Sequence, residues 1–216
     1  MLGLIMTLAI DSAAVTPPPG TYRYEAFIGK GSVGGTAVTL SNEAQGFKIT
    51  EASTSHLSNG DTRSNATLLL TPNLIPVTYT SSYKVQEDSM QMETSFDGRT
   101  ATVTAGTDKR TFQLGGSSKS FIILDNASMA GFLILPAQMR AWKDADTTAL
   151  VPAVGSQAFL SVLHGVSPQR PATLPAPDTS LSFEGETPFV EWYDPNTLIV
   201  DEVDVPGQNL RIVRRR

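Results

Sequence analysis

Residues 77–113, VTYTSSYKVQEDSMQMETSFDGRTATVTAGTDKRTFQ, decide the fold. Apolar or aromatic side chains alternate with polar ones, as in VTYTSSYKV and TATVTA, and this period of two is typical of half-buried strands. Short polar segments separate the alternating runs at 86–88, 97–98 and 107–109. Asp97-Gly98 lies between two such runs, where Asp-Gly favours a tight hairpin. The stretch therefore predicts consecutive antiparallel strands joined by short turns.

The same alternation extends in both directions along the chain. It recurs on the N-terminal side in YRYEAFI, TAVTL, FKIT and ATLLL, and near the C-terminus in VEWYDPNTLIVDEVDVPGQNLRIVRR. Strands that follow one another every 8–12 residues or so favour an antiparallel meander that curves toward a barrel or sandwich. The sequence predicts a mainly β protein with a single curved antiparallel sheet, a half-barrel or open barrel.

A glycine-rich segment, Gly29–Gly35 (GKGSVGG), contains the G-x-G-x-x-G pattern of dinucleotide-binding loops. That pattern binds phosphate only where it leads into a helix whose N-terminal amides face the ligand. Here TAVTLSNEAQGFKIT follows, which is a strand, a turn and another strand. We therefore interpret the segment as a hairpin connection, with glycines where φ is positive.

One segment, 124–142 (LDNASMAGFLILPAQMRAW), breaks the alternation. Asp125, Asn126 and Ser128 offer N-cap oxygens, and apolar residues then recur at helical spacing. Pro136 is expected to kink this helix or to start a second one. We expect the helix to pack on the concave face of the sheet. Two strands are expected after it, within 147–154 and 157–166, followed by a Pro-rich loop or lid over 167–180.

Composition limits the possible functions. The 216-residue chain has no cysteine, which excludes disulfides, thiolate metal sites and cysteine nucleophiles. Its net charge is −5, and the only basic run is Arg214–Arg216, so nucleic-acid binding is not expected. We predict one domain over 21–214 and no cofactor.

Residues 1–20 are read as a separate N-terminal segment. The apolar run Leu2–Ile10 is shorter than the roughly 20 residues of a transmembrane helix and resembles the core of a signal peptide. Ser12–Ala14 fits a cleavage site, and Pro17–Gly20 a stiff spacer. The positive charge that usually begins a signal peptide is missing, and the alternative is a buried strand or a disordered tail. We predict a periplasmic or secreted protein without a transmembrane segment.

The order of these elements resembles bacterial periplasmic half-barrel families of unknown function, related to lipoprotein-carrier-like folds. Three stretches carry the resemblance: YEAFIGKGSVGGTAVTL, the meander that ends in FIILDNASMAGFLIL, and VEWYDPNTLIVDEVDVPGQNLRIVRR. They cover most of 21–142 and 187–214, whereas the Pro-rich segment 167–180 has no place in the pattern. The resemblance implies a sheet curved around an inner helix and a site for an acyl chain or another hydrophobic partner.

No catalytic or metal-binding motif is present. His56 and His164 are the only histidines, and neither belongs to a G-x-S-x-G nucleophile elbow. The carboxylate clusters Asp144/Asp146 and Asp201/Glu202/Asp204 could hold a hard cation, yet no calcium-loop pattern surrounds them. We therefore predict no catalytic residue and no metal ligand.

Three functional hypotheses remain. The first is an exported, non-catalytic protein that holds a hydrophobic small molecule, a lipid or a lipidated envelope partner between sheet and helix. The second is a structural or assembly protein of the envelope with a filled core, and the third, ranked well behind, is a hydrolase or isomerase that uses His164 and nearby carboxylates. For the first, the predicted ligand-binding residues are Tyr79, Phe96, Met129, Phe132, Leu133, Leu135, Met139 and Trp142.

Overall fold

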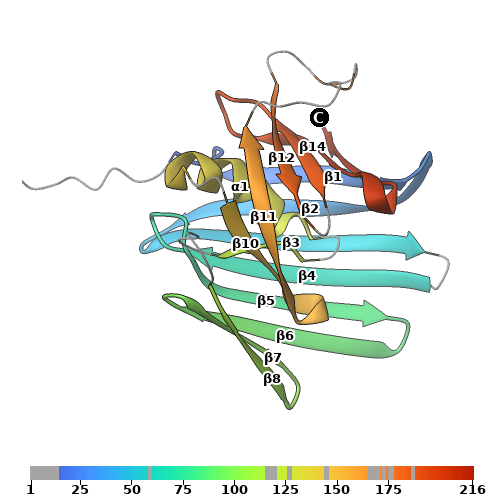
Figure 1. The fold of residues 1–216 in the computed structure, drawn as a ribbon. Helices are drawn as coiled ribbons and strands as arrows, with labels where there is room; N and C mark the ends of the chain where they lie inside the picture. Colours follow the sequence, from blue (N-terminus) through green and yellow to red (C-terminus); the bar gives the residue numbers. More distant parts are fainter. Residues whose placement is uncertain are drawn as a thin grey trace, which may run out of the picture.

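The computed structural model describes residues 15–57, 60–114, 121–125, 128–143, 146–164, 171, 174, 178–185 and 188–216. Within these ranges the chain forms one sheet of 15 strands, one α-helix and two short 3-10 helices (Figure 1). The predicted class, a mainly β protein with one open curved sheet and an inner helix, is confirmed. The sheet keeps two free edges, so it is not closed into a barrel.

The first eight strands run as one meander. They are β1 (Gly20–Ile28), β2 (Gly31–Glu43), β3 (Gly46–Leu57), β4 (Gly60–Leu70), β5 (Pro76–Val85), β6 (Asp88–Asp97), β7 (Thr100–Ala105) and β8 (Asp108–Gln113). After the edge strand β9 (Phe121–Ile123) and the helix α1 (Met129–Trp142), a second meander follows. It contains β10 (Asp146–Val151), β11 (Ser156–His164), β12 (Thr179–Glu184), β13 (Phe189–Tyr193), β14 (Val200–Val205) and β15 (Leu210–Arg215), with the 3-10 helices η1 (Pro152–Val154) and η2 (Pro206–Gln208).

The two meanders are joined through the first and last strands. β1 pairs with β15 in antiparallel register, so the strand order is β8 to β1, then β15 to β9. All neighbouring pairs are antiparallel except β9–β10, which is parallel. The second meander returns over the concave side of the first, because β9 contacts β5 and η1 contacts β6. This return encloses the core without pairing the two edges.

Both glycine turns expected from the sequence are present. Asp97 pairs with Thr100 across a two-residue turn, and Gly98 has a φ of 55°. At the other turn Gly29 has a φ of 58°, and the remaining glycines of the segment up to Gly35 lie inside β2. The G-x-G-x-x-G segment is thus a hairpin turn and the start of a strand.

Helix α1 lies inside the curve of the sheet, as expected, and contacts β2, β3, β4, β9 and β14. Ser128 is the N-cap, and its side chain accepts a hydrogen bond from the Ala130 amide. The helix runs through Pro136 without the expected second start, so that alternative was wrong. Gly131 lets α1 approach the backbone of β9 closely, since a Cβ at position 131 would lie 1.7 Å from the Ile123 carbonyl oxygen. Residues Met129–Met139 are all buried, so apolar burial on every side stabilises the helix.

The structure adds one strand that the alternation did not reveal. Strand β12 begins at Thr179, so the last two residues of the loop expected over 167–180 belong to a strand. Most of the rest of that segment lies outside the described residues, as do Asn126 and Asp144. Residues 1–14 also lie outside them, so the signal-peptide prediction stays a prediction. In the described part of the chain, no helix is long and apolar enough to cross a bilayer.

Candidate functional site

A cavity of about 170 Å³ lies between the sheet and the N-terminal end of α1. Strands β1 to β5, β15 and the first residue of α1 form its walls. The lining residues are Ala26, Gly35, Thr36, Ser53, Thr54, Ser55, Thr62, Ser64, Tyr83, Met129, Leu210 and Ile212.

The cavity has one hydroxyl-bearing wall. Thr36, Ser53, Ser64 and Tyr83 occupy one cross-strand row from β2 to β5 in the pairing register. Ser53 and Ser64 are joined by a hydrogen bond of 2.9 Å between their hydroxyl oxygens. Because side chains two apart on a strand share a face, this row lies on the concave side of the sheet.

The opposite wall is apolar. Ala26 and Ile212 face each other across the β1–β15 pair, and Leu210 lies two residues further along β15. Met129, the first residue of α1, is fully buried and closes the inner end. An apolar wall beside a row of hydroxyls suits an amphiphile with an apolar body and a polar end.

A buried carboxylate holds the helix against the cavity. Glu51 is 5% exposed, and its Oε2 accepts hydrogen bonds from Ser128 Oγ at 2.7 Å and from the Ala130 amide at 2.8 Å. Its Oε1 accepts from the Thr36 and Ser53 hydroxyls, both at 3.1 Å. A carboxylate at a helix N-terminus also interacts favourably with the helix dipole. Glu51 therefore connects the hydroxyl wall to the start of α1.

A second buried carboxylate lies beside the first turn of α1. Asp125 Oδ2 accepts hydrogen bonds from the hydroxyls of Tyr79, at 2.7 Å, and Tyr83, while Oδ1 accepts from the Ala153 amide at 3.2 Å. Asp125 thereby joins β5, the entry to α1 and η1. The two networks fix the position of Met129 at the cavity.

Burial raises the pKa values of Glu51, Tyr79 and Tyr83 above their ordinary values. Desolvation raises the pKa of Glu51, and the hydrogen bonds from Ser128 and Ala130 oppose that shift. Desolvation, followed by the nearby Asp125 charge, raises the pKa values of Tyr79 and Tyr83, which stay protonated as hydrogen-bond donors. The arrangement is therefore one of fixed donors and acceptors.

Six of the eight predicted ligand-binding residues lie in the hydrophobic core, and the other two are partly buried against it. Tyr79, Met129, Leu133 and Leu135 are fully buried, Met139 and Phe132 nearly so, and Phe96 and Trp142 pack against the same cluster. Of this set, Met129 lines the cavity between sheet and helix. A role of the others in ligand contact stays a prediction, because the structure shows them packed against one another.

The candidate catalytic and metal-binding groups that the structure describes do not line the cavity. His56 is exposed on β3 and pairs with Asp61 at 2.8 Å. The His164 and Asp146 side chains lie outside the described residues, as does Asp144. Asp201 pairs with Arg214 and Arg216, and Glu202 with Arg211. Among the described residues, no three His, Cys, Asp or Glu side chains are grouped to hold a metal ion.

The sequence interpretation missed the hydroxyl wall and Glu51. A signal for both was present, because Glu51, Ser53 and Ser55 continue the inward-facing phase of Phe47 and Ile49. A carboxylate and two hydroxyls at positions that should be apolar indicate a buried polar network. Ser128, the partner of Glu51, lies 77 residues away in the chain, and local sequence patterns do not reveal that the two residues meet.

The fold and the cavity together define an open β half-barrel wrapped around a helix. No family model matches this chain, and no curated protein matches it. The chain is similar to the crystal structure of a DUF1089 family protein from Pseudomonas aeruginosa, with a TM-score of 0.50 and 13% identity over 80% of this chain and 90% of that one. At this identity the likeness shows the fold alone. The neighbour belongs to a family of unknown function, and its description names no reaction.

Proposed function

We propose that this chain is an exported, non-catalytic binding protein that holds a hydrophobic ligand, or the acyl group of a lipidated envelope partner, between sheet and helix. The observation that carries the proposal is the cavity of about 170 Å³ at the start of α1, with its apolar and hydroxyl walls. Export rests on the signal-like residues 1–14 and the spacer Pro17–Gly20, both read from the sequence.

The size of the cavity sets the kind of ligand. An apolar cavity of about 150 Å³ accommodates a molecule as large as benzene. The cavity beside Met129 therefore has room for the end of an acyl chain rather than for a whole lipid. Each 100 Å² of apolar surface removed from water contributes roughly 2.5 kcal/mol, before the cost of immobilising the ligand. Affinity would come from apolar contact and orientation from the hydroxyl row.

A second candidate function is that of a structural or assembly protein of the envelope. The observation that favours it is the filled core, in which Tyr79, Leu133 and Leu135 are 0% exposed. Such a protein would bind its partner through the outer face and leave the cavity empty.

Native mass spectrometry distinguishes the two functions. The chain would be purified from an envelope fraction without detergent and measured before and after solvent extraction. The proposal predicts extra mass that extracts as a hydrophobic molecule, or uptake of added lauric acid by the extracted chain. A bare mass with no uptake would contradict the proposal and favour the assembly function.

A matched pair of variants locates the ligand. Ser64→Phe places an aromatic ring in the cavity, whereas Thr67→Phe places the same ring on the outer face of the same strand. We expect Ser64→Phe to weaken lauric acid uptake at least about tenfold and Thr67→Phe to leave it within about twofold. Equal uptake by both variants would show that the ligand lies elsewhere.

A further inference from the structure

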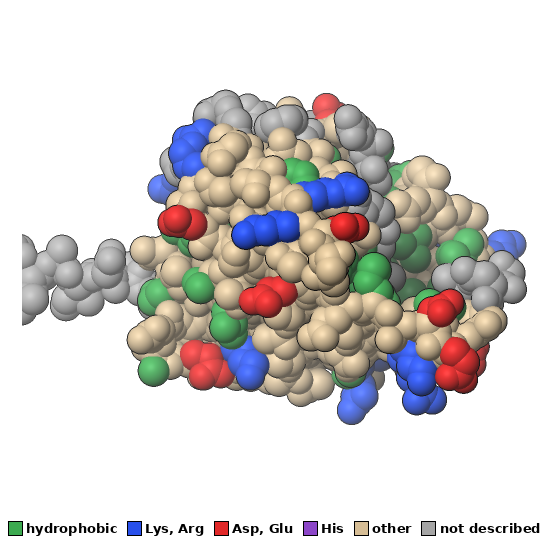
Figure 2. All heavy atoms as spheres, turned by 90° about the horizontal axis from the view of Figure 1, so that it is seen from below, with side chains coloured by type: hydrophobic (Ala, Val, Ile, Leu, Met, Phe, Trp, Pro, Cys, Tyr) green, Lys and Arg blue, Asp and Glu red, His purple; other side chains and the backbone are tan. Residues whose placement is uncertain are grey.

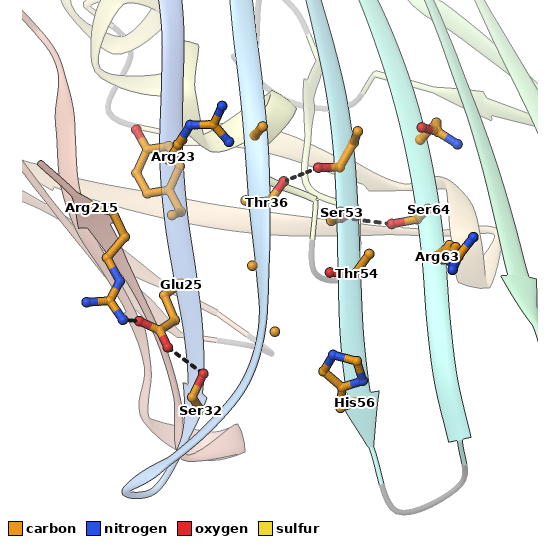
Figure 3. A pocket seen from close by; sticks show the side chains of 16 residues that line it. Arg23, Glu25, Ser32, Thr36, Ser53, Thr54, His56, Arg63, Ser64 and Arg215 are labelled. Atoms are coloured by element: carbon orange, nitrogen blue, oxygen red, sulfur yellow. Dashed lines mark hydrogen bonds and ion pairs between the residues drawn. The ribbon is translucent and has the colours of Figure 1, made fainter.

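A groove lies on the convex face of the sheet, across β2, β3 and β4 from the inner cavity, with which it shares Gly35, Thr36, Ser53, Thr54 and Ser64. It measures about 790 Å³ and crosses β15, β1, β2, β3 and β4 (Figure 3). The residues whose side chains occupy its outer-face rows are Arg23, Glu25, Ala37, Ala52, Thr54, His56, Arg63, Asn65 and Arg215.

The groove exists because its floor lacks large side chains. Ala37 and Ala52 face each other across β2 and β3, and Gly35 faces Thr54 in the next outer row. Gly34 adds to the floor, where a Cβ would meet the Thr54 carbonyl oxygen at 2.1 Å. The backbone of β2 is therefore accessible between two walls of longer side chains.

Both walls carry positive charge. Arg23 and Arg215 lie directly opposite each other on β1 and β15, and Arg63 lies on β4 beyond the floor. Like charges in opposite positions of a sheet are unfavourable. Glu25 engages Arg215 and accepts a hydrogen bond from Ser32. Within the described residues, Arg23 and Arg63 have no carboxylate partner, although the whole chain carries a net charge of −5.

We propose that this groove binds an extended acidic segment of a partner protein, with one carboxylate on Arg23 and another on Arg63. Three strand spacings separate β1 from β4, and Arg63 lies two residues along β4 from Asn65, which stands in the row of Arg23. The backbones of Arg23 and Arg63 are therefore about 16 Å apart. In an extended peptide, side chains at positions i and i+4 lie on the same side with their backbones about 13 Å apart, and the long Arg and Glu side chains span the remaining few ångströms. The small floor admits the peptide backbone, and the open shape suits a polymer segment better than an enclosed small molecule.

An anionic membrane fits the surface less well. A membrane-binding face needs a broad field of one sign. Around the groove the carboxylates of Glu25 and Asp61 lie among the cations, and on another face of the molecule acidic and basic side chains are likewise interspersed (Figure 2). The positive charge of the groove is instead confined to two walls around a narrow floor.

The test uses a fluorescein-labelled peptide, Glu-Ser-Thr-Ser-Glu, and its neutral counterpart Gln-Ser-Thr-Ser-Gln. Fluorescence anisotropy at low salt should detect binding of the acidic peptide, and binding should weaken as salt increases. The Arg23→Gln/Arg63→Gln variant should bind it about tenfold or more weakly, since each exposed ion pair contributes up to about 1 kcal/mol. Ala52→Glu, which adds a charge to the exposed floor, should have a similar effect.

Lys109→Gln provides the matched control, because Lys109 is an exposed strand cation on β8, far along the sheet. The affinity of the Lys109→Gln variant for the acidic peptide should stay within about twofold of that of the unchanged protein. Equal binding of the neutral peptide, no binding of the acidic one, or an equal effect of Lys109→Gln would overturn the proposal. Arg23- and Arg63-dependent sedimentation with phosphatidylglycerol vesicles, without peptide binding, would overturn it in favour of a lipid surface.

Discussion

Replacing Glu51 by alanine should detach the start of α1 from the sheet. The side chain accepts four hydrogen bonds, but Thr36 can still donate to the Ala52 carbonyl and Ser53 remains bonded to Ser64. The buried Ser128 hydroxyl therefore loses its acceptor, and the Ala130 amide keeps only its longer bond of 3.3 Å to Ser128 Oγ. A buried donor left unpaired costs about 1–3 kcal/mol, so the loss should be about 3 kcal/mol.

Urea unfolding followed by circular dichroism measures this loss directly, and the melting temperature should fall by roughly 6–12 °C for a chain of this size. Glu51→Gln keeps one acceptor oxygen and should lose about half as much. Glu43→Ala, at an exposed end of β2, should change the free energy of unfolding by less than about 0.5 kcal/mol. A loss below about 1 kcal/mol for Glu51→Ala would refute the view that this carboxylate anchors the helix.

Three further changes test other parts of the structure. Glu191 is fully buried with both carboxylate oxygens unpaired, and desolvation raises its pKa well above 4.5, so Glu191→Leu should stabilise the fold by about 2 kcal/mol at neutral pH. The raised pKa of Glu191 belongs to the folded state, so the free energy of unfolding of the native chain should fall as pH rises from about 4.5. In urea unfolding, the Glu191→Leu variant should therefore show a free energy of unfolding that depends less on pH. Gly131→Ala should destabilise the chain by about 3 kcal/mol or more in thermal unfolding, since its Cβ would collide with the Ile123 carbonyl. Tyr83→Phe removes a donor to Asp125 and should cost about 1 kcal/mol in urea unfolding, while lauric acid binding stays within about twofold because the ring remains in the cavity.

Each of these three predictions has a result that would contradict it. A less stable Glu191→Leu variant would mean that the carboxylate is paired in solution. Gly98→Ala meets no neighbouring atom and should cost only about 1 kcal/mol for its positive φ, so an equal loss at Gly131 would remove the argument from close approach. Loss of lauric acid binding in Tyr83→Phe would assign the hydroxyl a direct role in ligand contact.

The sequence predicts the sheet well because most strands expose one face and bury the other. The alternation of Tyr79 and its neighbours, and the Asp97-Gly98 turn, follow from local rules alone. Strand β12 escapes those rules, because Ser180–Phe183 is buried throughout and so does not alternate. The parallel pairing of β9 with β10 does not follow from local rules either, because it depends on where α1 leads the chain back to the sheet.

The candidate site was predicted only in part. The helical spacing in 124–142 correctly indicated an inner helix, yet a buried stripe looks the same whether it touches a ligand or other side chains. Packing distinguishes the two cases, and within the predicted set Met129 is the residue that lines the cavity between sheet and helix. The polar network could not be predicted in full, since Glu51 and Asp125 find their partners through tertiary contacts.

Methyl NMR of the methionines during a lauric acid titration tests the central claim most directly. The chain has six methionines, among them Met129 in the cavity, Met139 in the core at the far end of α1 and the exposed Met90. A ligand in this cavity should produce a saturable shift of the Met129 methyl signal with little change at Met139 and Met90. No shift at Met129, or shifts confined to Met139 or Met90, would contradict the assignment of this cavity as a ligand-binding site.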